Sequence, residues 1–302
     1  MSETIKLFSL KETSDPDIFR YIDLNGDWTH YHIKSKNQYV PAVNHILKIG
    51  FPKGIAFYNY LLSVSKEESQ KILESAGEKG SRVHDVIKNL IEGHKVTYGS
   101  LYPNSLTGRP EVLTLEEWQA LLSYQSFCEA YKPEVIMFEN SVATDQFAGT
   151  IDFVGMVTIN DKKAGPKKVK VLLDWKTSGA VYDDYKLQTA AYWRALADKE
   201  IKYTGVIRLG TKHKNGQVDN AGYEVKLWDI AETLKHYKAF ESALNIYNLN
   251  NSEFELDETT MPVEIQVNIP KYQSVKTVKP KKAKVKKTMA KKVETEKTDV
   301  TK

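Results

Sequence analysis

GTIDFVGMVTINDKKAGPKKVKVLLDWKTSGAVYDDYKLQTAAY, residues 149–192, contains the strongest structural pattern in this chain. It contains two apolar segments, Ile151–Ile159 and Val169–Trp175, and the glycine and proline of the intervening DKKAGPKK predict a loop between two strands. The second segment leads into Asp174 and Lys176, which are two residues apart. Because side chains alternate along a strand, we expect this acid and this lysine to project to the same face.

Polar groups at the end of an apolar strand need partners, because an unpaired buried charge is costly. Asp152 provides a second carboxylate if the two strands pair as a hairpin. The next segment, Tyr185–Ala197, has the apolar spacing of a helix, and its Gln188 and Tyr192 are four residues apart, on one face. These groups can therefore converge at one end of a sheet.

Two acids, a lysine and Gln-x-x-x-Tyr on the following helix resemble the PD-(D/E)XK nuclease superfamily, in its RecB-like exonuclease branch. That branch also has a histidine on an upstream helix, and the segment Gly80-Ser81-Arg82-Val83-His84 is similar to it. The resemblance spans about His84 to Tyr192. It implies an α/β fold with a restriction-endonuclease-like core, in which helices flank a mixed central β-sheet.

The resemblance also implies a metal site. Hard divalent cations prefer oxygen ligands, and an imidazole ligand suits Mn²⁺ at least as well as Mg²⁺. The implied ligands of Mg²⁺ or Mn²⁺ are His84, Asp152, Asp174 and the backbone carbonyl of Trp175. Glu139, on the preceding predicted strand, is a further candidate ligand, and a solvated strand residue is the equal alternative.

The resemblance assigns the remaining positions to catalysis. Lys176 would orient the attacking water or stabilise charge in the transition state, alongside the catalytic carboxylates of Asp152 and Asp174. Gln188 would hold Lys176 or the phosphate in place, and Tyr192 would contact the nucleic-acid backbone. The implied activity is that of a metal-dependent deoxyribonuclease, an exonuclease acting at DNA ends or in single strands during recombination, repair or replication.

Composition restricts the setting of this chemistry. The single cysteine, Cys128, excludes an intramolecular disulfide and suits a reducing, cytoplasmic compartment. It also means that this chain cannot alone form the four-cysteine iron–sulfur cluster of several RecB-like nucleases. No apolar run approaches the ~20 residues of a membrane span, and the N-terminus lacks the pattern of a signal peptide. We therefore expect no membrane partner.

The net charge of +4 is unevenly distributed. Residues 271–302 hold twelve lysines and three acids, which leaves 31 basic and 36 acidic residues in the first 270. The tail has little apolar surface and is predicted to be disordered. We expect it to bind DNA phosphates without sequence preference, and a solubilising tail or localisation signal is the alternative. Its candidate contacts are Lys281, Lys282, Lys284, Lys286 and Lys287.

The rest of the chain predicts one nuclease domain, residues 1–270, with a β-hairpin and helices in about 1–80 and the catalytic core in about 80–250. The predicted hairpin joins Arg20–Leu24 to Trp28–Ile33. A helical region is expected over 53–79, with a break near 63–65, and a separate helix over Ser81–Glu92 with Ser81 as its N-cap. Two further helices are expected, one from a capping box at Thr114 to Tyr131 and one over 229–248. Strands are expected at 134–142, 203–209, 223–228 and near 263–267.

Several readings of function stay open from sequence alone. No GxxxxGK[ST] motif is present, so a nuclease of this kind would act alone or with a separate helicase or recombination protein on DNA. One alternative is a non-catalytic nucleic-acid-binding or assembly protein on the same fold. Another is a structural protein whose basic tail is its sole nucleic-acid contact.

Overall fold

The computed structural model describes residues 4–6, 8–23, 26–104, 107–161, 165–210, 222–251 and 260–262. Within the compact unit Thr4–Met261, the largest sheet has five strands in the order β12-β11-β10-β9-β8. Their bounds are β8 (Glu134–Ala143), β9 (Ala148–Asp161), β10 (Gly165–Lys176), β11 (Tyr203–Leu209) and β12 (Tyr223–Asp229). β10 and β11 are parallel and the other neighbours antiparallel, so the expected mixed sheet is present.

The hairpin of β9 and β10 is confirmed, but its strands are longer than predicted. The ladder continues to Gly165 opposite Asp161, so most of the DKKAGPKK segment is strand and not loop. Glycine at position 165, with φ of 77°, permits the left-handed backbone at the start of β10. Lysines at the exposed end of a hairpin keep their charges in water while their backbones pair, which is why a polar segment extends these strands.

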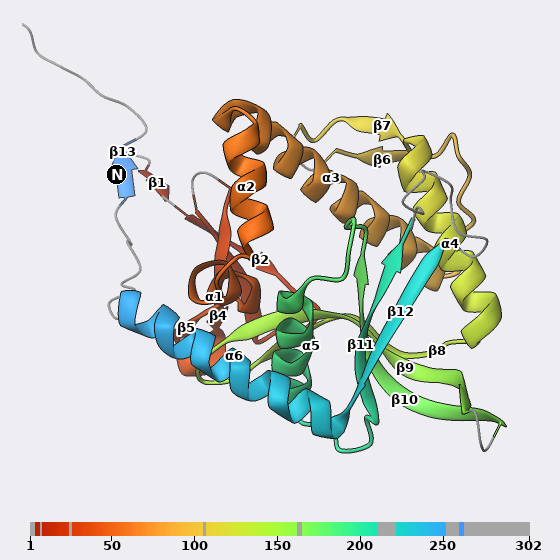
Figure 1. Cartoon of the computed structure of the whole chain (residues 1–302). Helices are drawn as coiled ribbons and strands as arrows, with labels where there is room; N and C mark the ends of the chain where they lie inside the picture. The colour runs from red at the N-terminus through yellow and green to blue at the C-terminus, as the bar shows by residue number, and fades with distance from the viewer. Residues whose placement is uncertain are drawn as a thin grey trace, which may run out of the picture. The chain divides into compact units, whose positions relative to one another are not determined.

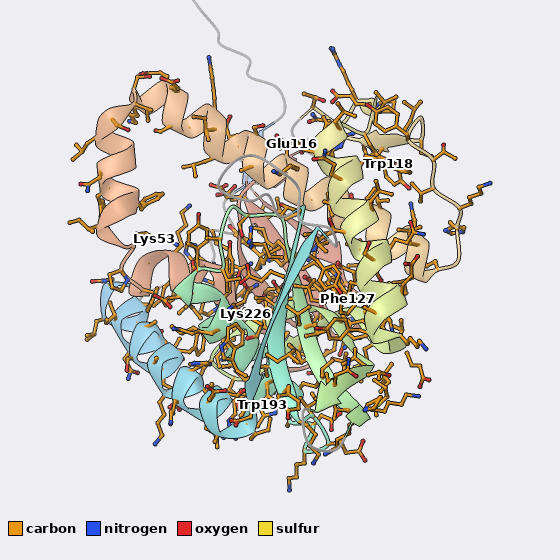
Figure 2. The ribbon with its side chains drawn as sticks, turned by 45° about the vertical axis from the view of Figure 1, so that its right-hand side comes forward. Lys53, Glu116, Trp118, Phe127, Trp193 and Lys226 are labelled. Carbon is orange, nitrogen blue, oxygen red and sulfur yellow. The ribbon has the colours of Figure 1, made fainter. Side chains whose placement is uncertain are left out.

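Helices cover both faces of this sheet (Figure 1). α3 (Lys66–Ile91) and α4 (Leu115–Tyr131) pack on one face, and α1 (Val43–Gly50), α5 (Asp183–Leu196) and α6 (Ile230–Asn250) pack on the other. Figure 2 shows Phe127 pointing from α4 toward the strands, where it is fully buried. Two apolar cores result, one on each face of the strands that carry the predicted acids.

α3 corrects one prediction. The break after α2 (Ile55–Ser63) is present as expected, but the following helix is continuous and Ser81 lies in its interior. Ser65 is the N-cap, and its hydroxyl accepts a hydrogen bond from the N–H of Glu68. Glycine at position 80 costs a helix only about 1 kcal/mol relative to alanine, which the buried apolar stripe that follows can offset. The other predicted helices, including the Thr114 capping box, are confirmed.

A second, four-stranded antiparallel sheet precedes the core. It comprises β2 (Phe8–Glu12), β3 (Ile18–Asp23), β4 (Trp28–Ile33) and β5 (Gln38–Pro41), with the 3₁₀ turn η1 (Lys34–Lys36) before β5. The predicted hairpin is the pair β3 and β4. Buried Tyr31 packs with Ala148 at the start of β9, and the Tyr31 hydroxyl lies 3.0 Å from Thr150 Oγ1. This sheet therefore contacts the strand that carries Asp152.

Two short ladders complete the described part. β1 (Thr4–Lys6) pairs with β13 (Thr260–Pro262), and β6 (Leu101–Pro103) pairs with β7 (Pro110–Val112). The predicted strand near 263–267 and the basic tail, residues 271–302, lie outside the described residues. Among the described helices, none is both long enough and apolar enough to cross a membrane.

Candidate active site

An aromatic anchor orients the end of β10. Trp175 is buried, with its ring centroid 5.3 Å from that of Tyr124, 6.0 Å from Phe127 and 5.6 Å from Phe153. Because neighbouring side chains on a strand point to opposite faces, this anchor directs Asp174 and Lys176 to the face covered by α5. Lys176 Nζ lies 2.5 Å from Asp174 Oδ2, as their shared face predicts.

A chain of hydrogen bonds extends from Lys176 into α5. Its ammonium donates to Gln188 Oε1 at 3.0 Å, and Gln188 Nε2 donates to the Tyr192 hydroxyl at 2.9 Å. Tyr192 is only 3% exposed and its ring lies against Gly149, where a Cβ would come within 2.3 Å of a ring carbon. The geometry therefore favours Tyr192 as a support for Gln188, because its burial leaves little surface for nucleic acid.

Asp152 lies next to these groups on β9. The register pairs Leu173 with Phe153, so the next residues along each strand bring Asp174 alongside Asp152. Asp152 Oδ2 accepts the backbone N–H of Trp175 at 2.8 Å. Burial and the nearby Asp174 carboxylate raise the pKa of Asp152 well above its usual value, against the opposing effects of Lys176 and the Trp175 N–H.

His84 approaches the carboxylates from α3. Its Nε2 lies 3.0 Å from the carbonyl oxygen of Trp175, and a carbonyl can only accept, so Nε2 carries the proton of this bond. In the neutral ring, Nδ1 then presents a lone pair, 3.6 Å from Asp152 Oδ2 and 3.9 Å from Glu139 Oε1. The Trp175 carbonyl, predicted as a ligand, here fixes the tautomer of His84.

Glu139 joins the cluster from β8. Its φ of 46° places a non-glycine residue in the left-handed region within a strand, a conformation that is costly unless its surroundings enforce it. Burial and the Asp152 carboxylate raise the pKa of Glu139 to about 7, although His84 and Arg20 oppose the shift. One ligand atom each from Glu139, His84 and Asp152 lies within 4.8 Å of the others.

These donors fit a divalent cation. An imidazole nitrogen and carboxylate oxygens are ligands that Mg²⁺ and especially Mn²⁺ accept. Burial and a neighbouring carboxylate raise both pKa values, with Asp152 acting on Glu139 and Asp174 acting on Asp152, and a bound dication would offset this repulsion. Asp174 faces the same cavity, but its carboxylate is paired with Lys176 and is not part of the close triad.

The cluster lines a cavity of about 510 Å³. Its lining includes the predicted residues on α3, α5, β8, β9 and β10. The four-stranded sheet adds residues that the sequence analysis did not assign to a site: Lys11, Arg20, Trp28 and Tyr31. The predicted lysine contacts of the tail lie outside the described residues.

Comparisons with known proteins give limited similarity. No family model matches the chain, and no curated protein matches it. Among solved structures, the chain is similar to an alkaline exonuclease from Laribacter hongkongensis, with 14% identity, a TM-score of 0.26, and coverage of 49% of this chain and 79% of that one. It is also similar to a phage-related exonuclease from Haemophilus somnus, with 13% identity, a TM-score of 0.29, and coverage of 71% and 96%. Such values assign no activity, so the function rests on the geometry of the site.

Proposed function

We propose that this chain is a divalent-metal-dependent deoxyribonuclease of the PD-(D/E)XK type, acting at DNA ends or in single strands. The observation that carries the proposal is the convergence of a lysine, three acids and a histidine at one cavity, on elements from distant parts of the chain. Those residues are His84, Glu139, Asp152, Asp174 and Lys176.

The donor set suits phosphodiester hydrolysis, in which water must attack a phosphate that repels anions. When bound, Mg²⁺ or Mn²⁺ would supply positive charge to the scissile phosphate and lower the pKa of the attacking water. His84 Nδ1 and the carboxylates of Glu139 and Asp152 would hold the cation, since these atoms lie together. Asp174 would sit between this site and the lysine that it pairs with.

Lys176 supplies the positive charge that belongs to the protein itself. Burial lowers its pKa, but the carboxylates of Asp174 and Asp152 outweigh that effect and raise it above its usual value. The side chain therefore stays an ammonium with protons to donate. Gln188 orients this ammonium through their hydrogen bond. Lys176 would then stabilise the negative charge that develops on the phosphate in the transition state.

The decisive experiment compares two lysines of β10. Lys176→Ala should reduce cleavage of DNA with Mg²⁺ or Mn²⁺ about a hundredfold or more. Lys170→Ala is the matched control, because Lys170 is also paired with acids, Asp198 and Glu200, but lies outside the cavity. Full activity of Lys176→Ala would overturn the proposal. DNA binding by the wild type without any cleavage would favour a non-catalytic binding protein.

The exonuclease part of the proposal needs its own test. End-labelled linear single strands, linear duplexes and circular single strands should be offered to the wild type in parallel. We expect cleavage of linear substrates and none of circles. Equal cleavage of circular DNA would leave the proposed nuclease activity standing and would show that it is an endonuclease and not an exonuclease.

A further inference from the structure

Two cations of the four-stranded sheet, Lys11 and Arg20, line the cavity and form what we call its cationic wall. Lys11 on β2 and Arg20 on β3 are directly paired across the antiparallel ladder, so their side chains share one face of the four-stranded sheet. Both residues line the cavity that also contains Asp152 and Lys176. Within the part of the chain that the structure describes, neither forms a salt bridge, although Lys11 lies within electrostatic range of Asp85 and Arg20 within electrostatic range of Glu139.

Arg20 is nevertheless held in place. Its Cζ lies 3.9 Å from the centroid of the Trp28 ring, and its Nη2 donates to Thr150 Oγ1 at 3.1 Å. The Nε atom is buried and has no hydrogen-bond partner among the described residues. The Trp28 ring and the hydroxyls of Thr150 and Tyr31 thus orient the planar guanidinium, and its terminal N–H groups are the donors that a ligand in the cavity would meet.

The position of Thr150 relates Arg20 to the proposed reaction centre. Thr150 and Asp152 are two residues apart on β9 and share a face, which separates them by about 7 Å. The charge of Arg20 also lowers the pKa of Glu139, so the two groups are close enough to interact. A substrate phosphate beside Arg20 would therefore neighbour the phosphate at the acids.

We infer that Arg20, backed by Trp28, binds the substrate phosphate adjacent to the scissile one, with Lys11 adding charge on the same wall. The inference rests on the proposed function. Guanidinium is the group that best matches phosphate, because its fork of N–H donors can bind two oxygens at once. Backbone phosphates carry no base identity, so this wall selects nucleic acid by charge and not by sequence.

The test uses Arg20→Gln and measures binding of a short fluorescent single-stranded DNA in EDTA, together with kcat and KM in Mn²⁺. Affinity should fall and KM should rise about tenfold to a hundredfold. The slope of log Kd against log salt should flatten by about 0.7, the value for one single-strand phosphate contact. Mn²⁺ binding, measured by calorimetry, should be retained, because none of the proposed ligands is changed.

Arg194→Gln is the matched control. Arg194 also lies over an aromatic ring, that of Tyr237 at 5.6 Å, but outside the cavity, so its loss should leave KM and the salt slope unchanged. Trp28→Phe should retain most of the affinity and Trp28→Leu should not, because the support is an aromatic face. Arg20→Lys should keep the salt slope and lose part of the affinity, since it retains charge without the fork.

Two results separate this inference from the proposed function. An Arg20→Gln enzyme with unchanged KM and unchanged salt slope overturns the phosphate contact, even if kcat falls. If the wild type never cleaves DNA, the proposed nuclease activity is refuted. If the salt slope of DNA binding nevertheless flattens in Arg20→Gln, the phosphate contact of Arg20 stands. Equal salt slopes of DNA binding for Arg20→Gln and Arg194→Gln would also contradict the phosphate contact of Arg20.

Discussion

Two clusters of polar residues lie inside this fold, and they differ in how their charges are satisfied. The carboxylate cluster consists of His84, Glu139, Asp152 and Asp174. The histidine cluster consists of His30 on β4, His45 on α1 and Tyr247 on α6. In the histidine cluster both ring nitrogens of His30 have partners, Thr29 Oγ1 at 2.9 Å and the Tyr247 hydroxyl at 3.2 Å.

The two clusters respond to burial in opposite ways. Burial lowers the pKa of His30 to about 4, with a further contribution from His45, so the histidine cluster stays neutral. In the carboxylate cluster, burial and neighbouring acids raise the pKa values of Glu139 and Asp152 and leave like charges crowded together. A packing core has no need of such crowding, whereas a cation site does. The contrast supports the proposal that the carboxylate cluster serves chemistry while the histidine cluster serves stability.

The largest expected effect comes from Asp152→Asn. Loss of this carboxylate should reduce cleavage about a hundredfold or more and weaken Mn²⁺ binding. Because the substitution removes a buried acid from a crowded site, the melting temperature of the metal-free protein should stay the same or rise. Activity assays, calorimetry with Mn²⁺ and thermal unfolding in EDTA measure the three quantities.

His30→Ala is the counterpart in the histidine cluster. It leaves the buried Tyr247 hydroxyl without this partner, so the free energy of unfolding should fall by about 1–3 kcal/mol while kcat is retained. The contrast between the clusters fails if Asp152→Asn keeps full activity or if His30→Ala loses activity at a temperature where it is folded.

A second pair of substitutions tests how packing supports each cluster. Gly149→Ala would drive a methyl group into the ring of Tyr192, and Gly50→Ala would place one 2.1 Å from the carbonyl oxygen of Ala243 on α6. Each should cost about 3 kcal/mol in unfolding free energy, because neither contact can give way easily. Gly149→Ala alone should also reduce kcat, since Tyr192 supports Gln188 and through it Lys176. Denaturant unfolding and kinetics on folded protein distinguish the two, and equal kcat values would contradict the role of Tyr192.

The third prediction concerns pH. Between pH 6.5 and about 4 the unfolded state protonates His30 while the folded state does not, so unfolding free energy falls as pH falls through this window. The loss should reach about 1–3 kcal/mol. Glu139 and Asp152 act in the opposite sense, because their raised pKa values let the folded state bind protons more tightly.

The pH experiment therefore needs a difference measurement. Denaturant unfolding of the metal-free wild type and of His30→Gln should be followed from pH 7 to 4. The gap between the two curves should shrink as the pH falls, since the variant has no imidazole to protonate at this position. Parallel curves would show that His30 does not titrate with an altered pKa.

Sequence patterns alone predict only the local pairs that line the cavity, whereas the meeting of His84 and Glu139 with Asp152 depends on tertiary packing and was implied by the resemblance. Strand alternation places Asp174 with Lys176, and four-residue helical spacing places Gln188 with Tyr192. The predicted helix start at Ser81 was wrong, because Ser81 suits an N-cap in sequence and only tertiary packing decides that the helix capped by Ser65 continues through Gly80.

The cationic wall was missed for a different reason. Lys11 and Arg20 are distant in sequence from the motif, and their place in the cavity depends on how the four-stranded sheet contacts β9. The sequence gives the charge of these two residues but does not show that their side chains share the face of the four-stranded sheet that lines the cavity. The left-handed backbone of Glu139 was equally invisible, because no glycine or asparagine marks it.

The smallest expected effect compares two buried tyrosine hydroxyls, one in contact with each cluster. Tyr192 accepts the hydrogen bond of Gln188, and Tyr247 bonds to His30. Tyr192→Phe and Tyr247→Phe each remove one oxygen and keep the ring, so each should lower the unfolding free energy by about 1 kcal/mol. Denaturant unfolding at pH 7 without metal provides both values under the same conditions.

Tyr192→Phe and Tyr247→Phe should have similar unfolding free energies, but their kcat values should differ. Tyr192→Phe frees the amide of Gln188 to rotate, so Lys176 is held less firmly and kcat should fall about threefold to tenfold with little change in KM. Tyr247→Phe should match the wild type in kcat, because no bond links its hydroxyl to the cavity through the described contacts. A rise in KM for Tyr192→Phe, with kcat unchanged, would instead assign its hydroxyl to direct contact with nucleic acid. Equal kinetics for both variants would mean that the hydrogen-bond chain ends at Gln188, with Tyr192 acting only as the ring that packs on Gly149.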